Sequence, residues 1–160
     1  MQVSGVSKTT LYKYFASKEE LILEVLNRRH EESMQHFRDY VEKSKQSYPH
    51  KQDEEHALAI FDALHDLING GCFYGCSFIN ASAEYSNIND PINAVSAAHK
   101  KSLSKFITGL LSNWSSSQRV ELADQFVIIL DGAIIAAHVR HDKKAAVKAK
   151  ATASKLLGLG

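Results

Sequence analysis

The sequence predicts an all-α protein, and three observations carry this prediction. Proline and glycine, the residues that most often interrupt helices, number only two and eight in 160 residues. In the long stretches between them, apolar residues recur at intervals of three and four, which is the period of an amphipathic helix. With 44% hydrophobic residues the chain can bury a core, so we expect one helical domain, with or without a small remnant beside it.

Two helices joined by a tight turn are expected at the start of the chain. Ser7 stands just before an apolar and aromatic run, where its hydroxyl can accept a hydrogen bond from an otherwise unpaired backbone N–H. Ser17 and Glu20, three residues apart, have the spacing of a capping box. These signals predict a short helix that ends near Phe15 and a long helix from Lys18 to about Lys45.

The rest of the chain divides into helices at clear breaks. Asn69-Gly70-Gly71 has the composition of a glycine C-cap, and Asp90 followed by Pro91 is a favourable helix start with the aspartate as cap. The predicted helices run from Asp53 or Glu54 to Ile68, from Ser77 to Tyr85, from Pro91 to about Trp114, from Ser117 to His141 and from Lys143 to Leu157.

The last two of these helices predict a homodimer. The helix from Ser117 to His141 is apolar on nearly all sides between Phe126 and Val139, so it lies centrally in a core or is covered by a partner. The helix from Lys143 to Leu157 is rich in alanine and would bury little by itself. Both make most sense when paired with copies of themselves across a two-fold axis.

Composition favours a cytoplasmic protein without a membrane partner. The chain has two cysteines, and its N-terminus shows no basic segment followed by an apolar one. The run from Phe126 to Val139 is interrupted by polar residues and is too short to span a bilayer. The net charge of +1 combines a basic start, an acidic middle over residues 52–142 and a basic end, whose lysines are interpreted as a solvated face.

No pattern indicates catalysis, a cofactor or a metal site. Cys72 and Cys76 are four residues apart and have no accompanying histidine pair, so they do not form a zinc motif. No nucleophile stands at a recognisable spacing from a base, and no glycine-rich loop could hold phosphates. We therefore do not expect an enzyme.

The short N-terminal helix has an unusual surface. Up to Lys18 the chain carries three lysines and no acid, interleaved with threonines and tyrosines. Such groups suit phosphate contacts and base edges in a DNA major groove. A short packing helix with a solvated cationic face would explain the same composition equally well.

The residues of this segment resemble one family of regulators. GVSKTTLYKYFASKEEL, residues 5–21, is similar to the recognition helix and the start of the next helix in the tetracycline-repressor (TetR) family of transcriptional regulators. GCSFINASAEY, residues 75–85, more weakly resembles part of the regulatory domain in one branch of that family. The resemblance implies an all-α fold in which residues 1–17 are a remnant of a helix-turn-helix head. Residues 18–160 would form a helical regulatory domain that binds a ligand and dimerises through its last two helices.

Members of the family carry two helices ahead of the point where this sequence starts, and residues 1–4 can supply at most the end of the second. Two hypotheses follow. The first is a transcriptional regulator, a repressor released by a small hydrophobic or aromatic effector, which binds operator DNA if the missing helices are present in the native protein. The second is an N-terminally truncated module that dimerises and binds a ligand but does not bind DNA on its own.

The resemblance also implies two sets of contact residues. Thr9, Thr10 and Lys13 are expected to face bases. Tyr12, Tyr14 and Lys18 are expected to hold phosphates. Lys8 also lies on the recognition helix and is a further DNA-contacting candidate. The ligand-binding candidates are aromatic residues and histidines of the predicted helices, each of which could equally be an ordinary core residue: Phe37, Phe61, His65, Phe78, His99, Phe106 and Phe126.

Overall fold

The computed structural model describes residues 8–71 and 73–159, and within them every regular element is a helix, as the sequence predicts. The elements are α1 (Lys8–Tyr14), α2 (Lys18–Ser47), α3 (Asp53–Ala57), α4 (Ala59–Asn69), α5 (Ser77–Glu84), α6 (Pro91–Leu110), α7 (Ser116–Arg140) and α8 (Ala145–Leu156).

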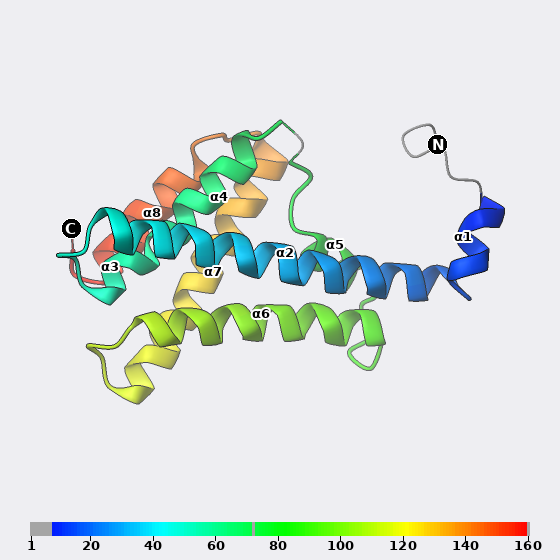
Figure 1. Ribbon diagram of the computed structural model, residues 1–160, viewed down its shortest axis with the longest axis horizontal. Helices are drawn as coiled ribbons and strands as arrows, with labels where there is room; N and C mark the ends of the chain where they lie inside the picture. Colours follow the sequence, from blue (N-terminus) through cyan, green and yellow to red (C-terminus); the bar gives the residue numbers. More distant parts are fainter. Residues whose placement is uncertain (1–7, 72, 160) are drawn as a thin grey trace.

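The long helix α2 organises the bundle. It runs along the longest dimension of the molecule, with α6 beside it and α4 packed against its C-terminal half (Figure 1). Helix α7 packs on α6, α4 and α8, and α8 packs on α4. Helix α1 projects from the N-terminal end of α2, clear of the bundle (Figure 1). A single helix therefore connects the projecting segment to the interior of the body.

The helix caps predicted at Ser17 and Asp90 are confirmed in detail, while the cap predicted at Ser7 lies outside the described residues and the last helix begins at Ala145 and not at Lys143. Ser17 Oγ accepts a hydrogen bond from the N–H of Glu20 at 3.1 Å. The carboxylate of Glu20 accepts from the N–H of Ala16 at 2.6 Å, one residue earlier than in the usual capping box. Asp90 Oδ1 accepts from the N–H of Ile92 at 2.8 Å, and Pro91 occupies the first turn of α6.

The helix predicted between Asp53 and Ile68 is interrupted once. The N–H of Leu58 bonds to the carbonyl of Glu55, and the N–H of Phe61 bonds to the carbonyl of Leu58, so the chain tightens there to three-residue spacing. Helix α3 therefore ends at Ala57 and α4 begins at Ala59. Neither proline nor glycine marks this break, which explains why the sequence pattern does not show it.

The main core lies where α2, α4, α6, α7 and α8 meet. Phe61 of α4 and Phe126 of α7 are fully buried there, with ring centroids 5.7 Å apart. A smaller apolar cluster joins α2, α5 and α6 through Leu26, Phe78 and Ile92. The second cluster lies closer to α1 and holds α5 against the N-terminal half of α2 (Figure 1).

Helix α7 has an apolar surface that the chain itself covers only in part. By length and composition it could cross a membrane, since the whole helix has 25 residues although the run from Phe126 to Val139 is shorter. Core helices of water-soluble proteins meet the same criterion. Only 28% of its most apolar window is buried within this chain, and Ile128, Ile135 and Val139 are exposed.

Candidate functional site

Helix α1 presents the predicted DNA-contacting residues on the surface. Tyr12 and Tyr14 are 65% and 77% exposed, and Thr9, Thr10 and Lys13 are also exposed. Lys8 lies in the same helix, but its side chain falls outside the described part of the structure. Hydroxyl, phenol and ammonium groups thus share a two-turn helix that projects from the body, an arrangement that suits backbone and base contacts to DNA.

Lys18 links the start of α2 to the end of α5. Its Nζ lies 3.1 Å from Glu84 Oε1, and both side chains are largely exposed. The hydrogen bond from Lys18 and the negative charge of Glu84 raise the pKa of the lysine. An exposed ion pair of this kind contributes little to stability, so Lys18 can exchange Glu84 for a phosphate at small cost.

A cavity of about 240 Å³ lies between α2, α4, α5, α6 and α7. This volume is below the range of about 300–1,000 Å³ typical of sites for drug-sized molecules, so a ligand that fits it is small. Its walls are mainly apolar and aromatic, with a few polar groups. The residues that line it are Arg29, Ser33, Phe37, Leu64, Leu67, Phe73, Tyr74, Gly75, Cys76, Ser77, Phe78, His99, Lys100, Leu103, Leu130, Asp131 and Ile134.

A stacked pair of rings forms one wall of the cavity. The rings of His99 and Phe78 are nearly parallel, with centroids 3.6 Å apart. His99 Nδ1 lies 3.0 Å from His30 Nδ1 on α2, so one of these nitrogens donates a hydrogen bond to the other. Burial lowers the pKa of His99 to about 3, and the positive charges of Lys100 and His30 add to this effect. His99 is therefore an uncharged wall residue at neutral pH.

Two charged groups of the cavity neutralise each other. Lys100 of α6 and Asp131 of α7 form a partly buried ion pair, with the ammonium donating to Asp131 Oδ1. Both belong to the cavity wall, and they connect α6 to the helix with the exposed apolar surface.

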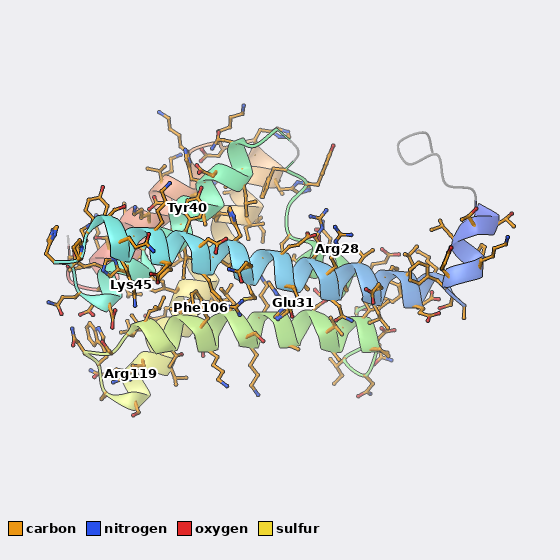
Figure 2. All side chains as sticks on the ribbon, viewed as in Figure 1. Arg28, Glu31, Tyr40, Lys45, Phe106 and Arg119 are labelled. Carbon is orange, nitrogen blue, oxygen red and sulfur yellow. The ribbon has the colours of Figure 1, made fainter. Side chains whose placement is uncertain are left out.

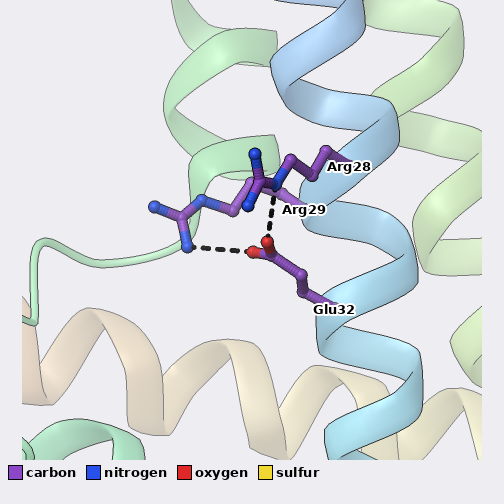
Figure 3. A network of polar contacts seen from close by, with 3 residues as sticks. All are labelled: Arg28, Arg29 and Glu32. Atoms are coloured by element: carbon purple, nitrogen blue, oxygen red, sulfur yellow. Dashed lines mark hydrogen bonds and ion pairs between the residues drawn. The ribbon is translucent and has the colours of Figure 1, made fainter.

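Arg29 is the remaining charged residue among the described lining residues. Its Nη1 donates to Glu32 Oε2 at 3.3 Å, while the neighbouring Arg28 donates from Nε to Glu32 Oε1 at 2.8 Å (Figure 3). The hydrogen bond from Arg28 lowers the pKa of Glu32, which is therefore ionised at neutral pH. Two guanidinium groups share one carboxylate at this edge of the cavity.

Of the seven predicted ligand contacts, the structure brings Phe37, Phe78 and His99 together around the cavity. Phe61 and Phe126 pack against each other in the main core. The remaining two lie elsewhere on the body. The ring of His65 interacts with Asn69 one turn later, and Phe106 lines a separate shallow groove between α2 and α6 (Figure 2).

Sequence reasoning did not predict the charged residues of the cavity, Arg29, Lys100 and Asp131. Arg29 was overlooked because it follows Arg28 in a helix that exposes many charges. Lys100 and Asp131 are 31 positions apart, and no local pattern shows that they meet. Among the described residues no group of three or more metal-ligating side chains comes together. Cys76 is a half-buried wall residue, and Cys72 lies outside the described residues.

Three of the exposed apolar residues of α7 form a stripe. Ile128, Ile135 and Val139 recur at intervals of seven and four, which places them on one side of the helix. They are 69%, 49% and 67% exposed. We call these three residues the α7 stripe. On α8, Val147 is also exposed.

Comparison with known proteins agrees with this arrangement. Residues 3–25 match the family model of the bacterial regulatory proteins of the tetR family. The crystal structure of SCO4454, a TetR-family transcriptional regulator from Streptomyces coelicolor, has a TM-score of 0.79 and 26% identity, over 95% of this chain and 77% of that one. A structure from Streptomyces avermitilis, described as a TetR transcriptional regulator, has a TM-score of 0.69 and 24% identity, over 95% of this chain and 81% of that one. A comparison with curated protein sequences found no match.

The all-helical body and the N-terminal segment together define a DNA-binding transcriptional regulator. Its N-terminal segment matches the TetR family model, and its fold over 95% of the chain is similar to that of a TetR-family regulator. Proteins of this family are regulators and not enzymes, in agreement with the sequence-based expectation.

Proposed function

We propose that this chain is part of a dimeric, cytoplasmic repressor that a small apolar effector releases from its operator. The observation that carries the proposal is that α2 both follows α1 and lines the cavity. Its N-terminal end follows the projecting helix α1, and Arg29, Ser33 and Phe37 further along the same helix line the cavity. A ligand that favours one position of α2 would therefore change the position of α1.

The release step requires a difference in affinity. An effector can shift the protein away from its DNA-binding state only if it binds the other state more tightly. The cavity is bounded by five different helices, so a small movement of α2 relative to α6 or α7 would change its shape. In a dimer, two copies of α1 must fit half-sites at a fixed separation, and a modest tilt of α2 would disturb that fit.

The DNA-binding part can be tested on duplexes selected from a randomised library with the product of the complete reading frame. Fluorescence anisotropy at several salt concentrations should show steep, salt-dependent binding. Lys18→Ala should weaken binding to selected and scrambled duplexes alike and reduce the slope of log K against log salt by about 1. Lys43→Ala, an exposed lysine further along α2, is the matched control and should have no effect.

Two results would contradict these assignments. A change in sequence preference in Lys18→Ala would show that the lysine reads bases and does not hold a phosphate. Absence of salt-dependent binding by the complete product would favour the alternative, a module that dimerises and binds a ligand without gripping DNA.

A further inference from the structure

The charges around the cavity restrict what the effector can be. Of the described lining residues, Arg29, Lys100 and Asp131 carry formal charges, and the last two neutralise each other. His99 is uncharged at neutral pH because burial holds its pKa at about 3. One positive charge, that of Arg29, is therefore left without a compensating charge on the cavity wall.

The carboxylate that Arg29 contacts is already shared. Arg28, Arg29 and Glu32 together carry two positive charges and one negative charge, and the shorter of the two contacts belongs to Arg28. Arg29 can therefore turn to another anion while Glu32 keeps Arg28 as its partner. Figure 3 shows Arg29 extending from α2 on the side of the loop that leads into α5, whose residues Gly75, Cys76 and Ser77 line the same cavity.

The start of α5 adds to the positive potential. Its N-cap residue is Cys76, whose side chain makes no capping hydrogen bond, and the helix begins at Ser77 on the cavity wall. The first N–H groups of a helix and its dipole favour a negative charge nearby. Leu64, Leu103 and Leu130 supply an apolar and buried part of the wall. The cavity thus has one cationic edge and one apolar interior.

We propose that the effector is a small, mainly apolar carboxylate whose anionic group is held by Arg29 and whose apolar body lies against Phe78 and the buried leucines. The inference rests on the proposed function, because it names the chemical class of that effector. The cavity volume favours a small molecule, and the guanidinium provides the planar pair of donors that suits a carboxylate.

Matched pairs of probes test the inference in the complete protein. Isothermal titration calorimetry with 2-naphthoate and 2-naphthamide, and with octanoate and octanamide, compares an anion and a neutral molecule of nearly the same shape. We expect a carboxylate to bind about tenfold or more tightly than its amide, as for a hydrogen bond to a charged group. Arg29→Gln should remove this preference, and Arg29→Lys should retain part of it.

Arg28→Gln is the matched control, because Arg28 contacts the same Glu32 but does not line the cavity. It should leave the preference unchanged, and melting curves should show all three variants folded, since Arg29 is largely exposed. Equal binding of amides and carboxylates, or equal loss in Arg28→Gln and Arg29→Gln, would overturn the carboxylate inference and leave the effector cavity standing. Binding of none of the four probes would overturn the inference and the effector cavity together, while the DNA assay would still report on α1.

Discussion

Helices α1 and α7 both leave much of their surface uncovered, but the two surfaces differ in chemistry. Helix α1 exposes hydroxyl, phenol and ammonium groups, and helix α7 exposes the α7 stripe of two isoleucines and a valine. Polar groups at a projecting helix remain well solvated until a charged partner displaces water. Apolar groups on a central helix lower the free energy only when a protein surface covers them.

Under the proposed function, each surface has a separate partner. A nucleic acid would meet α1, and a second copy of the chain would meet α7 and α8. The cavity lies between the two surfaces, with walls from both α2, which leads to α1, and α7. Under the proposed function, an effector bound in the cavity would therefore contact helices that lead to both surfaces.

The largest expected effect comes from placing a charge on the α7 stripe. Ile135→Asp should weaken the proposed dimer at least 100-fold, because two carboxylates would lose water at a symmetric interface. Size-exclusion chromatography with light scattering over a dilution series gives the dimer dissociation constant. Circular dichroism should show that the monomer keeps its helices, because Ile135 is half exposed.

Ile88→Asp is the matched control for that substitution. Ile88 is 80% exposed in the connection between α5 and α6, away from the α7 stripe. It should leave the oligomeric state unchanged. Dimers of unaltered affinity in Ile135→Asp would show that α7 has another partner.

A smaller effect is expected on the polar surface. Lys13→Ala should weaken binding to a selected duplex by about 1–3 kcal/mol and lower the preference over scrambled DNA, because Lys13 is predicted to face bases. Anisotropy competition with both duplexes measures the two effects. A uniform loss on both duplexes would move Lys13 to the phosphate-contacting group and make α1 a less specific surface than the comparison implies.

The sequence was sufficient for the ends of most helices because those signals are local. Ser17 with Glu20, and Asp90 with Pro91, specify helix starts through hydrogen bonds and dihedral angles within four residues. The short helix before Ser17 could be predicted from nearby residues for the same reason, whereas its contacts with DNA stay a prediction. The break at Leu58 carries no such signal, since neither proline nor glycine lies there.

The residues that line the cavity were harder to predict from the sequence than the helix ends. Phe78 and Phe126 look alike as apolar positions of predicted helices, yet one lines the cavity and the other lies in the main core. Which side of a helix faces a cavity depends on how five helices are rotated against one another. Arg28 and Arg29 differ in the same way, because consecutive positions on a helix point about 100° apart and only one of them reaches the wall.

The region between the two surfaces should be sensitive to acid. Because the pKa of His99 is lower in the folded protein than the usual value of 6.5, protonation favours unfolding. The stability that neutral His99 contributes is complete above pH 6.5 and is lost as the pH falls towards 3. Denaturant unfolding at pH 7 and pH 4 should show a loss on the order of 3 kcal/mol from this residue.

The substitution His99→Phe tests whether protonation of His99 causes the loss of stability in acid. The substitution keeps a ring against Phe78 but cannot be protonated, so the difference between wild type and variant should shrink as the pH falls from 7 to 4. His30 faces His99 directly, and its partner is lost in the variant, so wild type should be the more stable of the two at pH 7. Parallel acid profiles of the two proteins would exclude His99 as the source of the acid sensitivity.

The smallest expected effect is a difference in stability between alanine substitutions at two glycines of the connection between α4 and α5. Gly71 and Gly75 both have positive φ, +90° and +81°, so alanine is strained by about 1 kcal/mol at either position. A Cβ on Gly71 meets nothing within 4 Å, whereas one on Gly75 would lie 3.2 Å from His138 Cγ on α7. Gly75→Ala should therefore destabilise the protein more than Gly71→Ala does, and the difference should be about 0.5 kcal/mol in thermal or denaturant unfolding.

Of these two glycines, only Gly75 lines the cavity, so only Gly75→Ala should change the affinity for 2-naphthoate. Equal effects of the two substitutions would show that His138 moves aside freely and that the α5 loop is not held against α7.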